Sequence, residues 1–68
     1  MEPFKIKGEY IELIALLKVL GIAETGGHAK QIVEAGHVVR NGEIETRKRA
    51  KLIPGDELHI LDQRIRLS

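Results

Sequence analysis

The pair Asn41-Gly42 constrains the fold of this 68-residue chain more than any other local feature. Asn-Gly is the preferred pair for a two-residue hairpin loop of type I′, because both central residues of that turn need a positive φ angle. Such a turn would place Val39 opposite Ile44 on one face of the hairpin. The sequence therefore predicts an antiparallel hairpin with its tip at this pair.

Apolar residues recur at helical spacing in two segments that precede the hairpin. In residues 10–20 four leucines are related by steps of three and four, the pattern of a helix with one buried face. Gly21 suits the left-handed position that closes a helix. A second helix is predicted to begin after Thr25, a favourable N-cap residue, and to end before Gly36. The link between the helices is short, so we expect them to be neighbours.

Short alternating segments predict further strands. Residues 4–7, 57–60 and 64–67 each alternate apolar and polar side chains with the period of two that a half-buried strand requires. Pro54-Gly55 fits the central pair of a type II turn, since proline fixes φ and glycine accepts a positive φ. We therefore expect one α+β domain over residues 1–68, in which two antiparallel helices pack on a small, mainly antiparallel sheet of short strands.

The composition disfavours several classes of protein. The chain has no cysteine and no apolar run near the roughly 18 residues of a membrane span, and its N-terminus is too polar for a secretory signal. The histidines, His28, His37 and His59, lack metal-ligand spacing, and so small a domain has little room for a catalytic pocket. We expect a cytoplasmic, monomeric protein that contacts no membrane, is not an enzyme, and uses no metal or cofactor.

Charge is sorted along the chain, although the net charge is only +1. Residues 40–51 hold five basic and two acidic residues, whereas the remainder holds six basic and eight acidic residues. Four of the five residues 47–51 are cations that repel one another, and a polyanion would relieve that repulsion. A solvated loop is the serious alternative, whereas a position inside a compact domain disfavours an address signal. The distribution favours a phosphate-binding loop.

The start of the second predicted helix is a further candidate anion site. Gly26 and Gly27 follow Thr25, where free backbone N–H groups and the helix dipole attract anions and glycine allows a phosphate to approach. An equally good interpretation is that these glycines only shape the turn between the helices. Lys30 and Gln31 lie on the polar side of the helix. Lys30 supports a phosphate-binding site only if it points towards the basic run.

Two observations bear on how a nucleic acid would be contacted. Arg40 could bind phosphate, or it could pair with Glu43 across the hairpin and contribute no more than about 1 kcal/mol. Phe4 and Tyr10 are the only aromatic residues, and Phe4 has the pattern of a core residue. We therefore expect contact through phosphates and shape, without stacking of bases.

The order of these features resembles the S4-type RNA-binding domain, named after a small-subunit ribosomal protein. The motifs are the first helix, Thr25-Gly-Gly-x-Ala-Lys30, Gly36-x-Val38-x-x-Asn41-Gly42, the basic run and Leu52-x-x-Gly55-Asp56. The likeness spans residues 10–60, and the strands at 4–7 and 64–67 look like additions that let the domain stand alone. The resemblance implies the alpha-L motif and a structured RNA partner, such as ribosomal or transfer RNA. Carried over by position, it implies RNA contacts by Thr25, Gly26, Gly27, Lys30, Gln31, Arg40, Asn41, Arg47, Lys48, Arg49 and Lys51.

Two departures and two alternatives accompany this resemblance. Thr25 stands where serine is usual and keeps the cap, whereas Arg40 stands where an aliphatic residue often precedes Asn-Gly. Arg40 therefore either extends the basic surface or changes the packing of the hairpin.

The alternatives are a helix-turn-helix DNA binder that reads DNA with residues 26–35, and a protein-interaction module. The second resembles ubiquitin-like sulfur carriers, but the chain lacks their terminal Gly-Gly. A role in ribosome assembly or translation is open.

Overall fold

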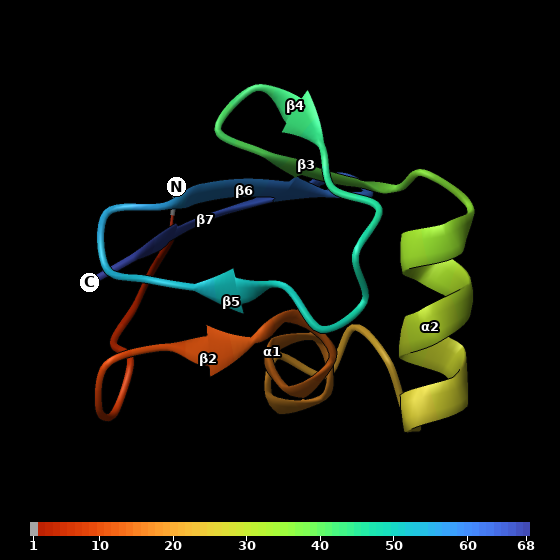
Figure 1. The fold of residues 1–68 in the computed structure, drawn as a ribbon, viewed down its shortest axis with the longest axis horizontal. Coiled ribbons are helices and arrows are strands. Elements are labelled where there is room, and N and C mark those ends of the chain that lie inside the picture. Colours follow the sequence, from red (N-terminus) through yellow and green to blue (C-terminus); the bar gives the residue numbers. More distant parts are fainter. Residues whose placement is uncertain (1) are drawn as a thin grey trace.

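A computed structural model describes residues 2–68, which form two helices and seven short strands (Figure 1). The elements are, in chain order, β1 (Glu2–Phe4), β2 (Ile11–Glu12), α1 (Leu13–Val19), α2 (Gly26–Glu34), β3 (Val38–Arg40), β4 (Glu43–Ile44), β5 (Lys51–Leu52), β6 (Glu57–Ile60) and β7 (Gln63–Leu67). Five strands form one sheet in the order β1-β7-β6-β3-β4, and β2 pairs with β5 in a second sheet. All these strand pairs are antiparallel except β1 with β7, which confirms the expected α+β fold.

The larger sheet has one buried face and one exposed face. Leu58 and Ile60 in β6, like Ile65 in β7, are buried, whereas the residues between them are exposed. The buried side chains join apolar residues of both helices in one hydrophobic cluster. Figure 1 shows α1 nearly end-on and α2 from the side, so the two helices cross steeply where an antiparallel pair was expected. One core, closed by the helices on one side of the sheet, therefore supports the whole fold.

The hairpin predicted from Asn41-Gly42 is confirmed. Asn41 has a φ angle of 51° and Gly42 one of 87°, as a type I′ turn requires. Val39 pairs with Ile44 in the expected register. The chemistry of two turn residues was therefore sufficient to predict how β3 and β4 pair.

The turn at Pro54-Gly55 is also confirmed. The backbone N–H of Asp56 donates to the carbonyl of Ile53 at 3.1 Å, and Gly55 has a φ angle of 100°. These values fit the type II turn, whose third residue needs a positive φ angle. The turn leads directly into β6.

Helix α2 begins and ends where the sequence predicts. The Thr25 hydroxyl oxygen accepts a hydrogen bond from the backbone N–H of His28 at 3.0 Å, which is an N-cap contact. Gly36 closes the helix with a φ angle of 81° and donates its N–H to the carbonyl of Val33. Neither helix of the described chain has the length and apolar character needed to cross a membrane.

Helix α1 begins at Leu13, three residues later than predicted. Ile11 and Glu12 form β2 instead, because they find an extended partner in β5. The first N–H groups of the helix donate outside it, from Leu13 to the carbonyl of Ala50 at 3.0 Å and from Ile14 to that of Lys48 at 3.3 Å. A long-range strand partner thus outweighs the local helical pattern.

The N-terminal strand begins two residues earlier than predicted and lies parallel to β7. Beyond β1, the N–H of Ile6 donates to the carbonyl of Ser68 at 2.8 Å. The side chain of Ile6 is buried in the core. The alternation in residues 4–7 therefore correctly predicts that this segment packs on the sheet. The strand that pairs with β7, however, is formed by residues 2–4.

Candidate nucleic-acid interface

Residues 45–50, which we name the basic loop, join β4 to β5 and lie against the start of α1. Two loop carbonyls, those of Lys48 and Ala50, accept the first helical N–H groups of α1, and the N–H of Ala50 donates to the carbonyl of Arg47 at 3.1 Å. The N–H of Glu45 donates to the carbonyl of Val38 at 2.9 Å. Because its backbone is held by these hydrogen bonds, the basic loop fixes the backbone positions of its cationic residues.

Glu45 is a buried acid, 8% exposed, that organises the basic loop. Its carboxylate accepts hydrogen bonds from the side chain and the backbone N–H of Arg47, both at 3.1 Å, and from the guanidinium of Arg40 at 3.3 Å. The Arg47 side chain has the largest effect and lowers the pKa of Glu45 to about 2, although burial opposes this shift. This role was not predicted from the sequence, where an acid two residues before a basic run was the available signal.

Acid is expected to destabilise the fold through Glu45. Its pKa falls from an ordinary value of 4.5 to about 2 on folding. Its contribution is therefore complete above about pH 4.5 and is lost as the pH falls towards 2, by at most roughly 3 kcal/mol. Urea unfolding between about pH 6 and pH 2.5 measures this loss. Glu45→Gln should be less stable at neutral pH and show a flatter fall; an unchanged slope would contradict the assignment.

Arg40 is a structural residue in this fold, with its side chain only 19% exposed. Its guanidinium lies 2.8 Å from the carboxylate of Asp56 and 3.3 Å from that of Glu45, and it also donates to the carbonyl of Lys51 at 3.0 Å. Arg40 pairs with Glu43 in the strand register, but its guanidinium contacts these other acids. Arg40 therefore ties β3 to the basic loop and to the turn before β6, and it leaves little of itself for a ligand.

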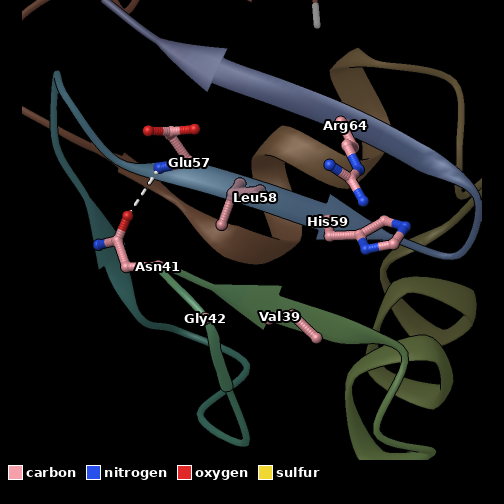
Figure 2. Close-up of a pocket in the computed structure, with 7 residues that line it drawn as sticks. All are labelled: Val39, Asn41, Gly42, Glu57, Leu58, His59 and Arg64. Atoms are coloured by element: carbon pink, nitrogen blue, oxygen red, sulfur yellow. Dashed lines mark hydrogen bonds between the residues drawn. The ribbon is translucent and has the colours of Figure 1, made fainter.

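Asp56, which is buried, and Asn41, which is exposed, complete this hydrogen-bond network. Burial would raise the pKa of Asp56, but hydrogen bonds from the Ile53 backbone, Asn41 and Arg40 outweigh it, and the pKa is lowered. The Asn41 amide donates to Asp56 at 2.9 Å. Its oxygen accepts from the N–H of Glu57 at 2.9 Å, the hydrogen bond drawn in Figure 2. Both ends of the Asn41 side chain are thus engaged within the protein.

Lys30 of α2 and the basic loop line one shallow depression, which answers the question left open by the sequence. We name it the basic depression; its lining residues are Lys30, Glu34, Thr46, Arg47, Lys48 and Arg49. Arg47 is 73% exposed even though Glu45 holds it. Lys30 lies 3.9 Å from Glu34 in an exposed pair, which is worth only a few tenths of a kcal/mol. Among the side chains that the structure describes, Lys48 and Arg49 have no ion-pair partner.

The remaining predicted residues lie elsewhere. Thr25, Gly26 and Gly27 form the first turn of α2 and do not line the basic depression. Gln31 is exposed on α2 beside Lys30. Lys51 does not line the basic depression. Its amine lies over the ring of Tyr10, 5.0 Å from the ring centre. The predicted site therefore divides into the basic depression, the α2 start, the hydrogen-bond network and Lys51.

A second depression lies on the exposed face of the large sheet, away from both helices (Figure 2). Val39, His59 and Arg64 come from β3, β6 and β7 and are direct cross-strand neighbours. Within residues 2–68 no three histidine, aspartate or glutamate side chains gather closely enough to hold a metal ion. The Asn41 amide and the Glu57 carboxylate line the same depression, but none of these side chains is a serine, threonine or cysteine nucleophile.

The fold and the order of helix, hairpin and basic loop define an S4 domain: the family model for that domain matches residues 4–68. The chain belongs to the S4 domain family. The match includes residues 4–7 and 64–67, so these two segments belong to the family pattern and are not additions to it. An Escherichia coli K12 protein named "Putative RNA-binding protein YbcJ" is 43% identical over 49 residues, which cover 72% of this chain and 70% of that protein. A Shigella flexneri protein named "Uncharacterized protein YbcJ" matches to the same extent.

Proposed function

We propose that this chain binds structured RNA through phosphate contacts made by the basic depression, with Lys30, Arg47, Lys48 and Arg49 as the contacting residues. The observation that carries the proposal is that these four cations, from two elements distant in sequence, line one surface. Membership of the S4 domain family and the name of the Escherichia coli relative support the choice of RNA as the ligand. Thr25, Gly26, Gly27 and Gln31 extend the proposed surface along α2.

The proposed contact depends on the loop being held before the RNA arrives. Glu45 fixes the Arg47 guanidinium, and the carbonyls of Lys48 and Ala50 are bound to α1. Phosphate contacts made by such a preformed surface position an RNA by its shape and its backbone geometry, without reading the bases directly. An RNA helix or a folded RNA would satisfy this surface better than an extended strand.

A salt series is the experiment that tests this function. If about four phosphates are neutralised, the logarithm of affinity for an RNA hairpin should fall with the logarithm of salt concentration with a slope of about −3 to −4. Fluorescence anisotropy with a labelled hairpin at several potassium chloride concentrations measures the slope. Competition with duplex DNA serves as the control: equal competition would favour the helix-turn-helix alternative, and a flat salt response would contradict the proposal.

The proposal extends to the setting in which the RNA is bound. We place the chain as a monomeric, non-catalytic protein of the cytoplasm that uses no cofactor and acts on ribosomal or transfer RNA, in ribosome assembly or translation. The charge sorting and the S4 fold support a polyanionic partner in each case. Crosslinking in cells, followed by sequencing of the bound RNA, distinguishes these partners.

A further inference from the structure

Tyr10 forms part of a pocket remote from the basic depression. The pocket is lined by Phe4, Lys5, Lys7, Tyr10, Ile11 and Val19, and its volume is about 400 Å³. That volume lies within the range of roughly 300–1,000 Å³ typical of small-ligand sites. In Figure 1 the turn before β2 and helix α2 lie at opposite sides of the molecule, and the two depressions share no lining residue.

The pocket combines an exposed ring with apolar walls. Tyr10 is 44% exposed and Val19 is 63% exposed, and both side chains line the pocket. The backbone of residues 4–6 is fixed against the C-terminal strand, and Ile11 lies in the β2–β5 sheet. The ring therefore lies on an ordered wall, where a flat aromatic ligand could stack without first ordering the protein.

Two lysines line this pocket, and a third lies over its ring. Lys5 and Lys7 line the pocket and are exposed, and the amine of Lys51 lies 5.0 Å from the centre of the Tyr10 ring. The acids nearby are Glu9, next to Tyr10 in the chain, and Glu12, the strand partner of Lys51. The cations exceed the acids, so the pocket favours an apolar, planar ligand that carries a negative charge. An unpaired nucleotide has that chemistry, since every base offers a π-face beside a phosphate.

We propose that the Tyr10 pocket binds an unpaired nucleotide of the RNA, with the base stacked on Tyr10 and the neighbouring phosphates contacted by Lys5, Lys7 and Lys51. This inference rests on the proposed RNA function and adds a second contact to it. It also changes the expectation, drawn from the scarcity of aromatic residues, that base stacking plays no part. Lys51 keeps a role in RNA binding, but at a different surface from that of Arg47, Lys48 and Arg49.

The single tyrosine makes the test direct. The chain contains one tyrosine and no tryptophan, so its tyrosine ring signals in a proton NMR spectrum come from Tyr10 alone. Adding a pentauridine oligonucleotide to the full chain should move these signals upfield as a base stacks on the ring. Ring signals that stay unchanged at saturating oligonucleotide would overturn the proposal. Signals that move with protein concentration in the absence of RNA would also overturn it, because a second copy of the chain would then occupy the pocket.

Matched variants and a pair of RNAs separate this inference from the proposed function. One RNA is a blunt hairpin, and the other carries the same stem with a five-uridine overhang. Tyr10→Leu should bind the overhang hairpin about 5- to 100-fold more weakly than the wild type, as the loss of one stacked base predicts. The blunt hairpin should bind unchanged, which also shows that the variant folds. Tyr10→Phe keeps the ring and should keep the affinity.

The possible failures have different meanings. If the wild type binds both hairpins equally and Tyr10→Leu binds them as the wild type does, the pocket is not a nucleotide site, while the proposed RNA function stands. If the wild type binds neither hairpin at low salt, the proposed function fails and this inference fails with it.

Discussion

Reversing the charges of Lys48 and Arg49 together is expected to weaken RNA binding by roughly a hundredfold or more. The double variant Lys48→Glu with Arg49→Glu removes two phosphate contacts and places two acids against the RNA backbone. Such like-charge contacts cost several kcal/mol, and each 1.4 kcal/mol is tenfold in affinity. Anisotropy titrations of the blunt hairpin, in the same buffer as the wild type, measure the change.

The fold should survive this double reversal. Both side chains are exposed and have no ion-pair partner among the described side chains, and the loop backbone is held through carbonyls and N–H groups that the substitutions leave in place. Circular dichroism and urea unfolding should therefore differ little from the wild type. The salt slope should become shallower by about two phosphate contacts, near 0.9 for each.

A control with the same net charge separates local contact from general repulsion. Each reversal removes one positive charge and adds one negative charge, so the double variant goes from +1 to −3. Lys18→Glu with Arg64→Glu makes the same change at exposed positions outside the basic depression. This control should lose much less affinity. Equal losses in the two variants would mean that only net charge matters, and an unchanged affinity in the first would refute the proposed interface.

Local turn and cap chemistry predicted the elements that the structure confirms. The Asn41-Gly42 pair carries its own φ requirement, and Thr25 carries its own cap, so neither needs a distant partner. Residues 11 and 12 are different, because their strand conformation depends on pairing with β5 far along the chain. A periodic pattern cannot contain that information, and the helix was predicted to begin too early.

The candidate site likewise has a part that the sequence predicts and a part that only the fold determines. The basic run itself is visible in the sequence, and so is the polar side of α2, but the meeting of Lys30 with residues 46–49 is a property of the fold. The burial of Glu45 and Asp56 likewise could not be predicted from the sequence. An acid is buried only where donors from several elements converge on it, and here the donors come from β3, the hairpin turn, the basic loop and Ile53.

Replacing Arg40 by methionine is expected to destabilise the fold by about 3–5 kcal/mol. Methionine keeps much of the apolar stem but leaves two buried acids, Glu45 and Asp56, without the guanidinium that joins them. Breaking a buried ion pair by removing one partner has a cost of that size. Folded domains of this length are stable by only about 3–10 kcal/mol, so urea unfolding should show a large shift.

Arg66→Met is the matched control for this variant. Arg66 lies 3.9 Å from Glu57 in an exposed pair on the large sheet, and such pairs contribute about 0–1 kcal/mol. Its loss should therefore be small. Similar losses in the two variants would contradict the structural role assigned to Arg40.

Arg40→Lys then separates this structural role from a direct phosphate contact. Lysine keeps the charge but cannot reproduce the fork that contacts Asp56, Glu45 and the Lys51 carbonyl together. If Arg40 acts through the network, Arg40→Lys should lose stability and should weaken RNA binding only as far as the basic loop loosens, with an unchanged salt slope. A loss of RNA affinity at full stability would instead place the Arg40 guanidinium on the RNA.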